Sequence, residues 1–236
     1  YLTGNPQITF FKVVYRRHTN FALESIQQTF NGSVGYGSRV TATISRNGDL
    51  ISRAYLVLGV GSTETKLCNY FGLRAIKHAE VEIGGQRIDK HYSDWMYIWN
   101  ELSMPVGKKE GYYEMIGGAG GNLSGKSLYV PLEFWFCRNI GLALPLIGLQ
   151  YHEVKINIQF EEALNVLNTG STASEAGTLT AALWVDYIYL DTDERRKFAQ
   201  SSHEYLIEQL QFTGRESASN KIKLNFNHPV KELVWV

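Results

Sequence analysis

Hydrophobic and polar residues alternate with a period of two along much of this chain. From residue 154 to 160 every second position is apolar, and the positions between hold Lys155, Asn157 and Gln159. Successive side chains of a β-strand point to opposite faces of a sheet, so this run predicts a strand with one buried and one polar face. The same alternation occurs at residues 40–44, 80–83 and 221–226.

Three further runs are apolar on both faces, and they predict central or covered strands. They span residues 52–59, 129–136 and 183–190. Pairs that tolerate positive φ punctuate the strands, and these pairs are Asn31-Gly32, Asn47-Gly48, Gly84-Gly85 and Gly117-Gly118. Short strands separated by such turns are typical of a β-sandwich or barrel.

Two short helices are expected between the strands. Ser93 is placed to cap the first, in which Trp95, Ile98, Trp99 and Leu102 would share one face before Pro105 ends it. The second begins at Thr192, with acidic residues in its first turn as the helix dipole favours. Two long connections, residues 95–127 and 161–178, are expected to be functional loops.

Composition narrows the class of protein. The chain has 236 residues, with 23 Lys plus Arg and 23 Asp plus Glu, and this balance does not favour a surface devoted to nucleic acid. Cys68 and Cys137 form no disulfide framework, which indicates folding in a reducing compartment. No apolar run has the length of a membrane span, about 18 residues, and no signal peptide is recognisable. The apolar end at residues 233–236 predicts a piece of a longer protein.

Residues 120–127 match the phosphate-loop pattern GxxxxGK[ST], with Lys126 in the lysine position. A phosphate loop needs a following helix, whose N-terminus holds the phosphate. The residues after Ser127 predict a strand instead, so a surface loop is the favoured interpretation and nucleotide binding the alternative.

Two His-Glu pairs raise the possibility of a metalloenzyme on a jelly roll, as in cupins. His152-Glu153 and His203-Glu204 both lie at expected strand starts, and neither has the HExxH spacing. Polar edge residues are the favoured interpretation. We define no catalytic set from the sequence, and we expect no enzyme activity, metal or cofactor.

Two weaker features concern sugars. Tyr112 and Tyr113 are the conspicuous aromatic residues of the long loops, and a carbohydrate-binding protein would need such residues exposed. Asn31 and Asn122 head N-glycosylation sequons, which normally stay unmodified in a protein folded in the cytosol.

Extended segments in one order identify a resemblance. Residues 4–21, 24–31 (ESIQQTFN), 44–50 (ISRNGDL), 82–92 (EIGGQRIDKHY), 141–154, 203–214 and 224–229 resemble the major capsid proteins of nucleocytoplasmic large DNA viruses, most closely those of algal viruses. The agreement covers nearly the whole chain, which makes it more specific than any short motif.

The resemblance implies an all-β fold, an eight-stranded antiparallel jelly-roll sandwich with short helices in long loops, the first of two in tandem. It implies an N-terminal arm at residues 1–24, the first jelly roll at 25–214, and at 215–236 a linker and the opening strand of a second jelly roll. The function implied is that of a structural subunit of an icosahedral capsid, assembled in the host cytoplasm as homotrimeric, pseudo-hexagonal capsomers that contact their neighbours in the virion.

The arm carries the one candidate interface named from the sequence. Lys12, Arg16, Arg17 and His18 stand among aromatic residues. Our hypothesis is that these cations contact minor capsid proteins or the head groups of an internal membrane. The alternative is a solvated arm that packs its aromatic rings under its own sandwich. The long loops would face outward.

Overall fold

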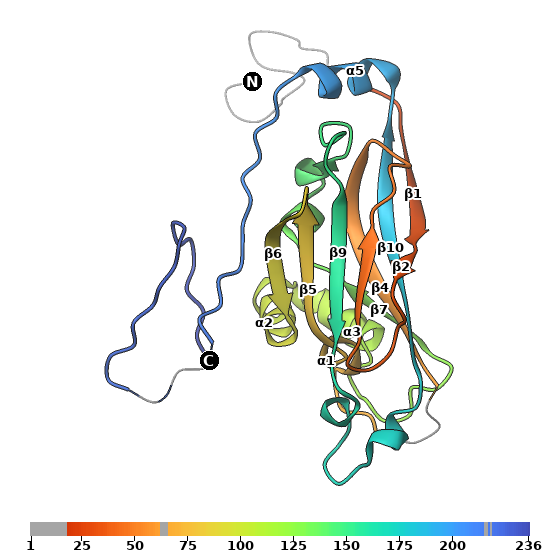
Figure 1. Cartoon of the computed structure of the whole chain (residues 1–236), viewed down its shortest axis with the longest axis vertical. Helices are drawn as coiled ribbons and strands as arrows, with labels where there is room; N and C mark the ends of the chain where they lie inside the picture. Colours follow the sequence, from red (N-terminus) through yellow and green to blue (C-terminus); the bar gives the residue numbers. More distant parts are fainter. Residues whose placement is uncertain (1–17, 62–65, 215–216, 218) are drawn as a thin grey trace.

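The computed structural model describes residues 18–61, 66–214, 217 and 219–236. Two antiparallel sheets pack face to face and form a β-sandwich (Figure 1). The first sheet has the strand order β1 (Phe21–Gln28), β10 (Leu179–Leu190), β4 (Leu50–Val60) and β7 (Ser127–Pro131), with β8 (Leu144–Pro145) paired to β4. The second has the order β2 (Phe30–Asn31), β3 (Arg39–Thr43), β9 (Val154–Phe160), β5 (Ile76–Ile83) and β6 (Gln86–Tyr92).

Apart from the two-residue strands β2 and β8, eight strands remain in the described chain, four in each sheet. Strands distant in sequence are neighbours, since β1 pairs with β10 and β3 pairs with β9. This topology confirms the predicted eight-stranded jelly roll.

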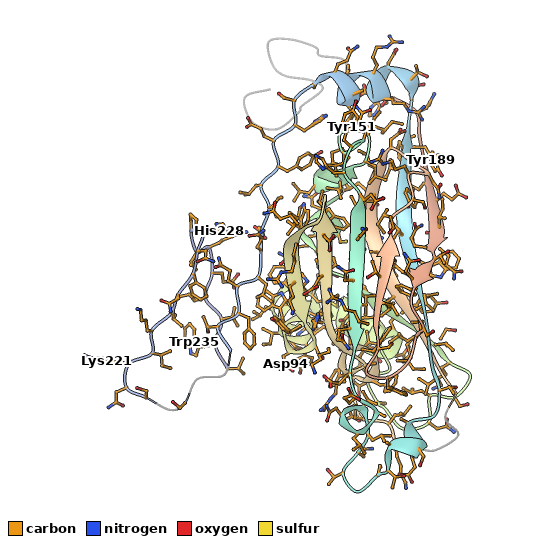
Figure 2. The ribbon with its side chains drawn as sticks, viewed as in Figure 1. Asp94, Tyr151, Tyr189, Lys221, His228 and Trp235 are labelled. Carbon is orange, nitrogen blue, oxygen red and sulfur yellow. The ribbon has the colours of Figure 1, made fainter. Side chains whose placement is uncertain are left out.

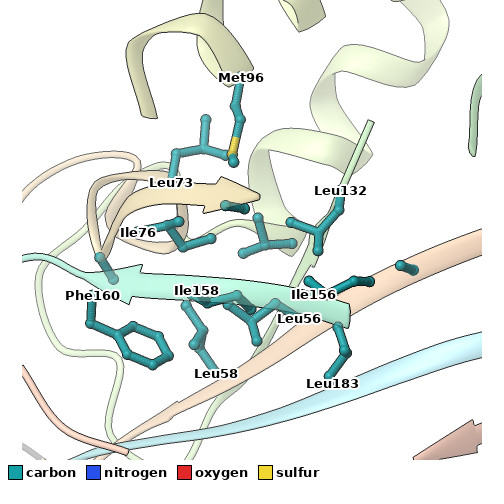
Figure 3. Packing of buried hydrophobic residues seen from close by; sticks show 14 of the residues in the cluster. Leu56, Leu58, Leu73, Ile76, Met96, Leu132, Ile156, Ile158, Phe160 and Leu183 are labelled. Atoms are coloured by element: carbon teal, nitrogen blue, oxygen red, sulfur yellow. The ribbon is translucent and has the colours of Figure 1, made fainter. Parts of the chain in front are cut away.

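The core lies between the sheets, where their inward faces meet (Figure 3). Ile156 and Ile158 of β9 are fully buried and face Leu56 and Leu58 of β4, which are buried as completely. The period-two pattern of residues 154–160 therefore predicted both the strand and its buried face. Two of the three runs that are apolar on both faces became central strands, because β4 lies between β10 and β7, and β10 lies between β1 and β4.

A tight turn joins β5 to β6. Gly84 and Gly85 have φ of +59° and +83°, the conformation of a type I′ hairpin turn, which glycine adopts without steric cost. The Gly84-Gly85 pair was thus a correct turn signal.

Three helices, α1 (Phe71–Arg74), α2 (Ser93–Ser103) and α3 (Val106–Met115), gather at the end of the sandwich opposite α5 (Thr192–Gln200) (Figure 1). Short helical turns fill other connections, and they are α4 (Trp135–Arg138), η1 (Ile140–Leu142), η2 (Ala163–Val166) and η3 (Ala173–Ala176). None of the described helices has the length and apolar character that a membrane crossing requires.

The structure corrects the sequence prediction for α2. The cap position is Tyr92, and Ser93 Oγ donates instead to the carbonyl of Leu73, at 2.9 Å. The buried residues are Met96 and Asn100, whereas Leu102 is 60% exposed. The inward face is therefore rotated by about one position from the predicted one.

The loop predicted at residues 95–127 contains α3 as well as α2. The predicted strand at residues 129–136 is also corrected, because this run is not one strand. Pro131 ends β7, and the chain turns into α4 so that Phe134, Trp135 and Phe136 are all buried in the core. Three consecutive buried aromatic residues suit a turn inside the core better than a strand, whose side chains would alternate outward.

No strand or helix is assigned among the described residues after Gln200. Ile222 and Leu224 still alternate with polar residues, but a strand forms only beside a hydrogen-bonding partner. The domain limits at residues 24 and 214 and the opening strand of a second jelly roll stay predictions.

Candidate functional site

Of the four arm residues named from the sequence, three lie outside the described residues. They are Lys12, Arg16 and Arg17. His18 is exposed and precedes β1. The interface hypothesis for these four residues stays a prediction.

The loop that matches the phosphate pattern leads directly into β7, as the sequence indicated. Gly120 has φ of +62°, and a Cβ placed on it would lie 2.6 Å from backbone atoms of Leu67 and Cys68. The next amide, of Gly121, donates to the carbonyl of Leu67 at 2.8 Å. Gly120, the first glycine of the motif, therefore allows two backbone segments to pack closely. This packing explains why a glycine is needed here even if no nucleotide binds.

The two His-Glu pairs take up separate structural positions. His152 is exposed and packs beside the turn at Gly84. The ring of His203 stacks on Phe198 at 5.1 Å between centroids, and its Nε2 lies 2.6 Å from the carbonyl oxygen of Phe198. Within the described ranges, no group of three or more His, Cys, Asp or Glu side chains could hold a metal ion.

Both sequon asparagines are exposed, Asn31 in β2 and Asn122 in the loop before β7. The side-chain oxygen of Asn122 accepts from the amide of Ser124 at 3.0 Å. Modification of either residue stays a prediction.

The chain after α5 lies along β6, the edge strand of the second sheet, and residues 205–212 of it are called the strap (Figure 1). Gln209 Nε2 donates to the carbonyl of Ile88 at 2.5 Å, and the amide of Leu210 donates to Asp89 Oδ1 at 3.1 Å. Phe212 packs against the ring of Tyr92. The strap occupies an edge that could otherwise pair with another chain.

Asp89 and His91 form a buried pair beneath the strap. Their side chains are 1% and 2% exposed, and His91 Nε2 lies 2.9 Å from Asp89 Oδ2. Among the described residues Oδ2 has no aligned hydrogen-bond donor, so Nε2 of His91 lies beside it without a well-formed hydrogen bond. The carboxylate thus connects the strand, the histidine and the strap.

Arg138 provides a second attachment for the strap. Its guanidinium lies 3.9 Å from the ring centroid of Trp99 and donates to Glu208 Oε2 at 3.0 Å. Nearby, burial raises the pKa of Glu133, although the charges of Arg138 and His91 act in the opposite direction. This connection joins α2, α4 and the strap.

The outer face of the first sheet carries exposed apolar side chains. Phe21 and Leu23 of β1 are 68% and 60% exposed, and Tyr129 and Trp184 are 46% and 36% exposed. Trp184 pairs with Tyr55, and Tyr129 pairs with the neighbouring Val57. We call Phe21, Leu23, Trp184, Tyr55 and Tyr129 the apolar sheet face; a surface of this kind is typical of protein interfaces.

The outer face of the second sheet is polar and centred on Glu80. Lys90 Nζ lies 3.2 Å from Oε1, and Arg39 Nη2 lies 3.0 Å from Oε2 of this carboxylate, whose side chain is 8% exposed. Burial alone would raise the pKa of Glu80, but the hydrogen bond and charge of Lys90, with the charges of His78 and Arg39, outweigh it and lower the pKa.

Because the folded pKa of Glu80 is lowered, its stabilising effect is present above its ordinary pKa and is lost as the pH falls through the folded value. We expect Glu80→Gln to lower the free energy of unfolding by about 1–3 kcal/mol at pH 7, with a smaller difference from the unmodified protein at pH 3. Urea titrations at both pH values measure this. Glu153→Gln, which removes an exposed partner of Lys155, should change stability by less than about 1 kcal/mol. Equal effects of Glu80→Gln at both pH values would contradict the assignment.

A group of tyrosines lines an open cavity of about 240 Å³ between α2, α3 and the start of α1. Tyr112 and Tyr113, noted from the sequence, are joined there by Tyr70 and Tyr97. No signal in the sequence could have identified Tyr70 and Tyr97 as lining residues. Tyr70 is brought to the cavity by contacts between distant segments, and Tyr97 lies in a helix whose orientation was not predictable.

Comparison with known proteins gives matches over nearly the entire chain. Residues 9–191 match a family model described as "Major capsid protein N-terminus", and residues 194–236 match one described as "Large eukaryotic DNA virus major capsid protein". A major capsid protein of Pyramimonas orientalis virus is 62% identical over 100% of this chain and 61% of its own length. That of Paramecium bursaria Chlorella virus 1 is 50% identical over 100% of this chain and 57% of its own.

Among solved structures, a quasi-atomic model of the PBCV-1 virus capsid matches with a TM-score of 0.83 and 48% identity. The match covers 94% of this chain and 57% of that one. The chain thus spans less than two thirds of the length of these relatives.

Proposed function

This chain belongs to the family of major capsid proteins of large eukaryotic DNA viruses, and on this premise we propose that it builds the shell of a virus particle. The observation that carries the proposal is the eight-stranded jelly roll, which superimposes on the PBCV-1 capsid with a TM-score of 0.83. The relatives are named capsid proteins, which supports a structural protein and not an enzyme.

In this proposal residues 1–24 are an arm, 25–214 the first jelly roll, and 215–236 the entry into a second one. The length of the relatives supports this division, since they continue well beyond the matched part. Two separate family models, which match residues 9–191 and 194–236, also support a division into two parts, with a boundary that falls before residue 214. The subunit would reside in the virion shell after assembly in the host cytoplasm.

We further propose that three subunits associate as a pseudo-hexagonal capsomer. Two similar jelly rolls per subunit would give six similar units per trimer, so that a threefold object could tile a hexagonal lattice. The apolar sheet face supports a large subunit interface, because obligate interfaces bury about 2,000 Å² or more of total surface and are more hydrophobic than transient ones. Neighbouring capsomers, minor capsid proteins and an internal membrane are the further partners of this proposal.

Light scattering coupled to size-exclusion chromatography tests the trimer. The full-length protein that contains this chain should have three times its chain mass, and Trp184→Glu should shift it toward the monomer, because a buried unpaired charge is costly at an interface. Leu164→Glu is the matched control, since Leu164 is 59% exposed in η2, away from this sheet. A monomer of the unmodified protein at micromolar concentration would refute the trimer.

A further inference from the structure

The tyrosine cavity has features that the packing of a shell protein does not require. Tyr70 has φ of +57° and ψ of +36°, and among the described residues it is the sole non-glycine residue with positive φ. Such a conformation costs about 1–2 kcal/mol in a residue with a Cβ. It places the Tyr70 ring edge-to-face against Tyr97 at 5.0 Å and Tyr113 at 5.3 Å.

Helix α3 forms the other wall without burying any of its residues. Its Lys109, Tyr112 and Tyr113 are half-buried, and the other residues of the helix are exposed. Tyr97 of α2 stays 40% exposed. The Tyr97 ring is therefore accessible at the cavity mouth, whereas Tyr112 packs against the core.

The polar lining adds hydrogen-bonding groups beside the rings. Glu101 and Glu110 line the cavity with Lys109, whose Nζ lies 2.7 Å from Glu101 Oε2. Glu101 and Glu110 contribute two negative charges and Lys109 one positive charge, which leaves a formal charge of −1. Carboxylates accept hydrogen bonds from hydroxyl groups, and they repel anionic ligands.

We propose that this cavity binds a neutral sugar ring. A pyranose presents an apolar C–H face, which an aromatic ring covers, and hydroxyl groups at its edge, which carboxylates bind. The cavity volume is about 240 Å³. Sites for drug-sized ligands have volumes of about 300–1,000 Å³, so this smaller cavity suits a single ring. The local negative charge selects against sugars that carry a carboxylate.

This site goes beyond the proposed shell function and does not depend on it. A jelly-roll shell protein needs contacts at its sides, whereas α2 and α3, which carry most of the residues that line the cavity, lie at the end of the sandwich opposite α5 (Figure 1). Failure of the sugar site would leave the shell function intact, and the reverse also holds.

Saturation-transfer NMR on the purified chain tests the proposal, with the methyl glycosides of galactose, glucose and mannose as neutral probes and that of N-acetylneuraminic acid as the acidic probe. At least one neutral probe should bind, with a Kd on the order of 1 mM, and the acidic probe should bind several-fold more weakly. Tyr97→Ala should weaken binding by about three- to tenfold, and Tyr97→Phe should retain most of it.

Tyr151→Ala is the matched control, because Tyr151 is 89% exposed and lies near α5 at the far end (Figure 2). It should leave binding unchanged. Glu110→Lys changes an exposed residue and should bring the affinities for the acidic and neutral probes closer together. Absence of transfer to every neutral probe, or equal losses in Tyr97→Ala and Tyr151→Ala, would overturn the proposal.

Discussion

Replacing Asp89 by alanine is expected to lower the free energy of unfolding by about 2–4 kcal/mol, because it removes a charge-assisted hydrogen bond and leaves buried polar groups unsatisfied. The change removes the carboxylate beside His91 and the acceptor of the Leu210 amide, and both groups are then left buried or half-buried without that partner. The strap should also detach from β6. Urea unfolding measures the stability, and hydrogen exchange at the Leu210 amide reports the detachment.

Asp94→Ala is the matched control, since Asp94 is exposed in the first turn of α2 (Figure 2). It removes an exposed carboxylate for which the described part of the chain provides no ion pair, so the change loses mainly the interaction with the helix dipole and should cost less than about 1 kcal/mol. If Asp89→Ala were no more destabilising than Asp94→Ala, the buried pair could not be what fixes the strap to the edge strand.

Gly120→Ala is expected to destabilise the fold by about 2–5 kcal/mol, through overpacking and an unfavourable left-handed φ together. The added Cβ would lie 2.6 Å from backbone atoms of residues 67 and 68, which cannot rotate away as a side chain could. Differential scanning calorimetry of the variant and the unmodified chain, at equal protein concentration, should show a lower Tm for the variant.

The second motif glycine provides the comparison. Gly125 has φ of +72°, but no atom lies within 4 Å of a Cβ built on it. Gly125→Ala should therefore cost only the left-handed strain, about 1–2 kcal/mol. If the loop bound a nucleotide, substitution of either glycine should weaken nucleotide binding. If close packing explains the glycines, only Gly120→Ala should lower the stability strongly. Equal destabilisation by the two changes would contradict the packing argument.

The strands were predictable because their burial follows a local period. In β9 the sequence alone identified the buried face, and the Gly84-Gly85 pair identified the hairpin turn. The helices at the loop end were not predictable in the same way. Helix α3 buries none of its residues, so it has no apolar stripe to detect. In α2 the buried Asn100 is a polar residue, and its amide is satisfied by the carbonyl of Met96 at 2.7 Å.

The candidate sites divide in a similar way. Local motifs at residues 120–127 and at the His-Glu pairs could be weighed from sequence, because each chemistry requires a definite neighbouring element. The Asp89–His91 pair and the tyrosine cavity depend on contacts between distant segments. Asp89 contacts Leu210 of the strap, and Tyr70 contacts Tyr113, although each pair is far apart in the sequence. A pattern along one strand or helix carries no information about such contacts.

The most direct test of the shell function is an immunoblot of purified virus particles from the source, separated on a density gradient and probed with an antibody raised against this chain. We expect a strong band in the dense particle fractions, at a mass well above the 26.7 kDa of this chain, because the relatives are longer than the matched part. A band found only in the soluble fractions, with none in the particles, would contradict the proposal that this protein builds the shell.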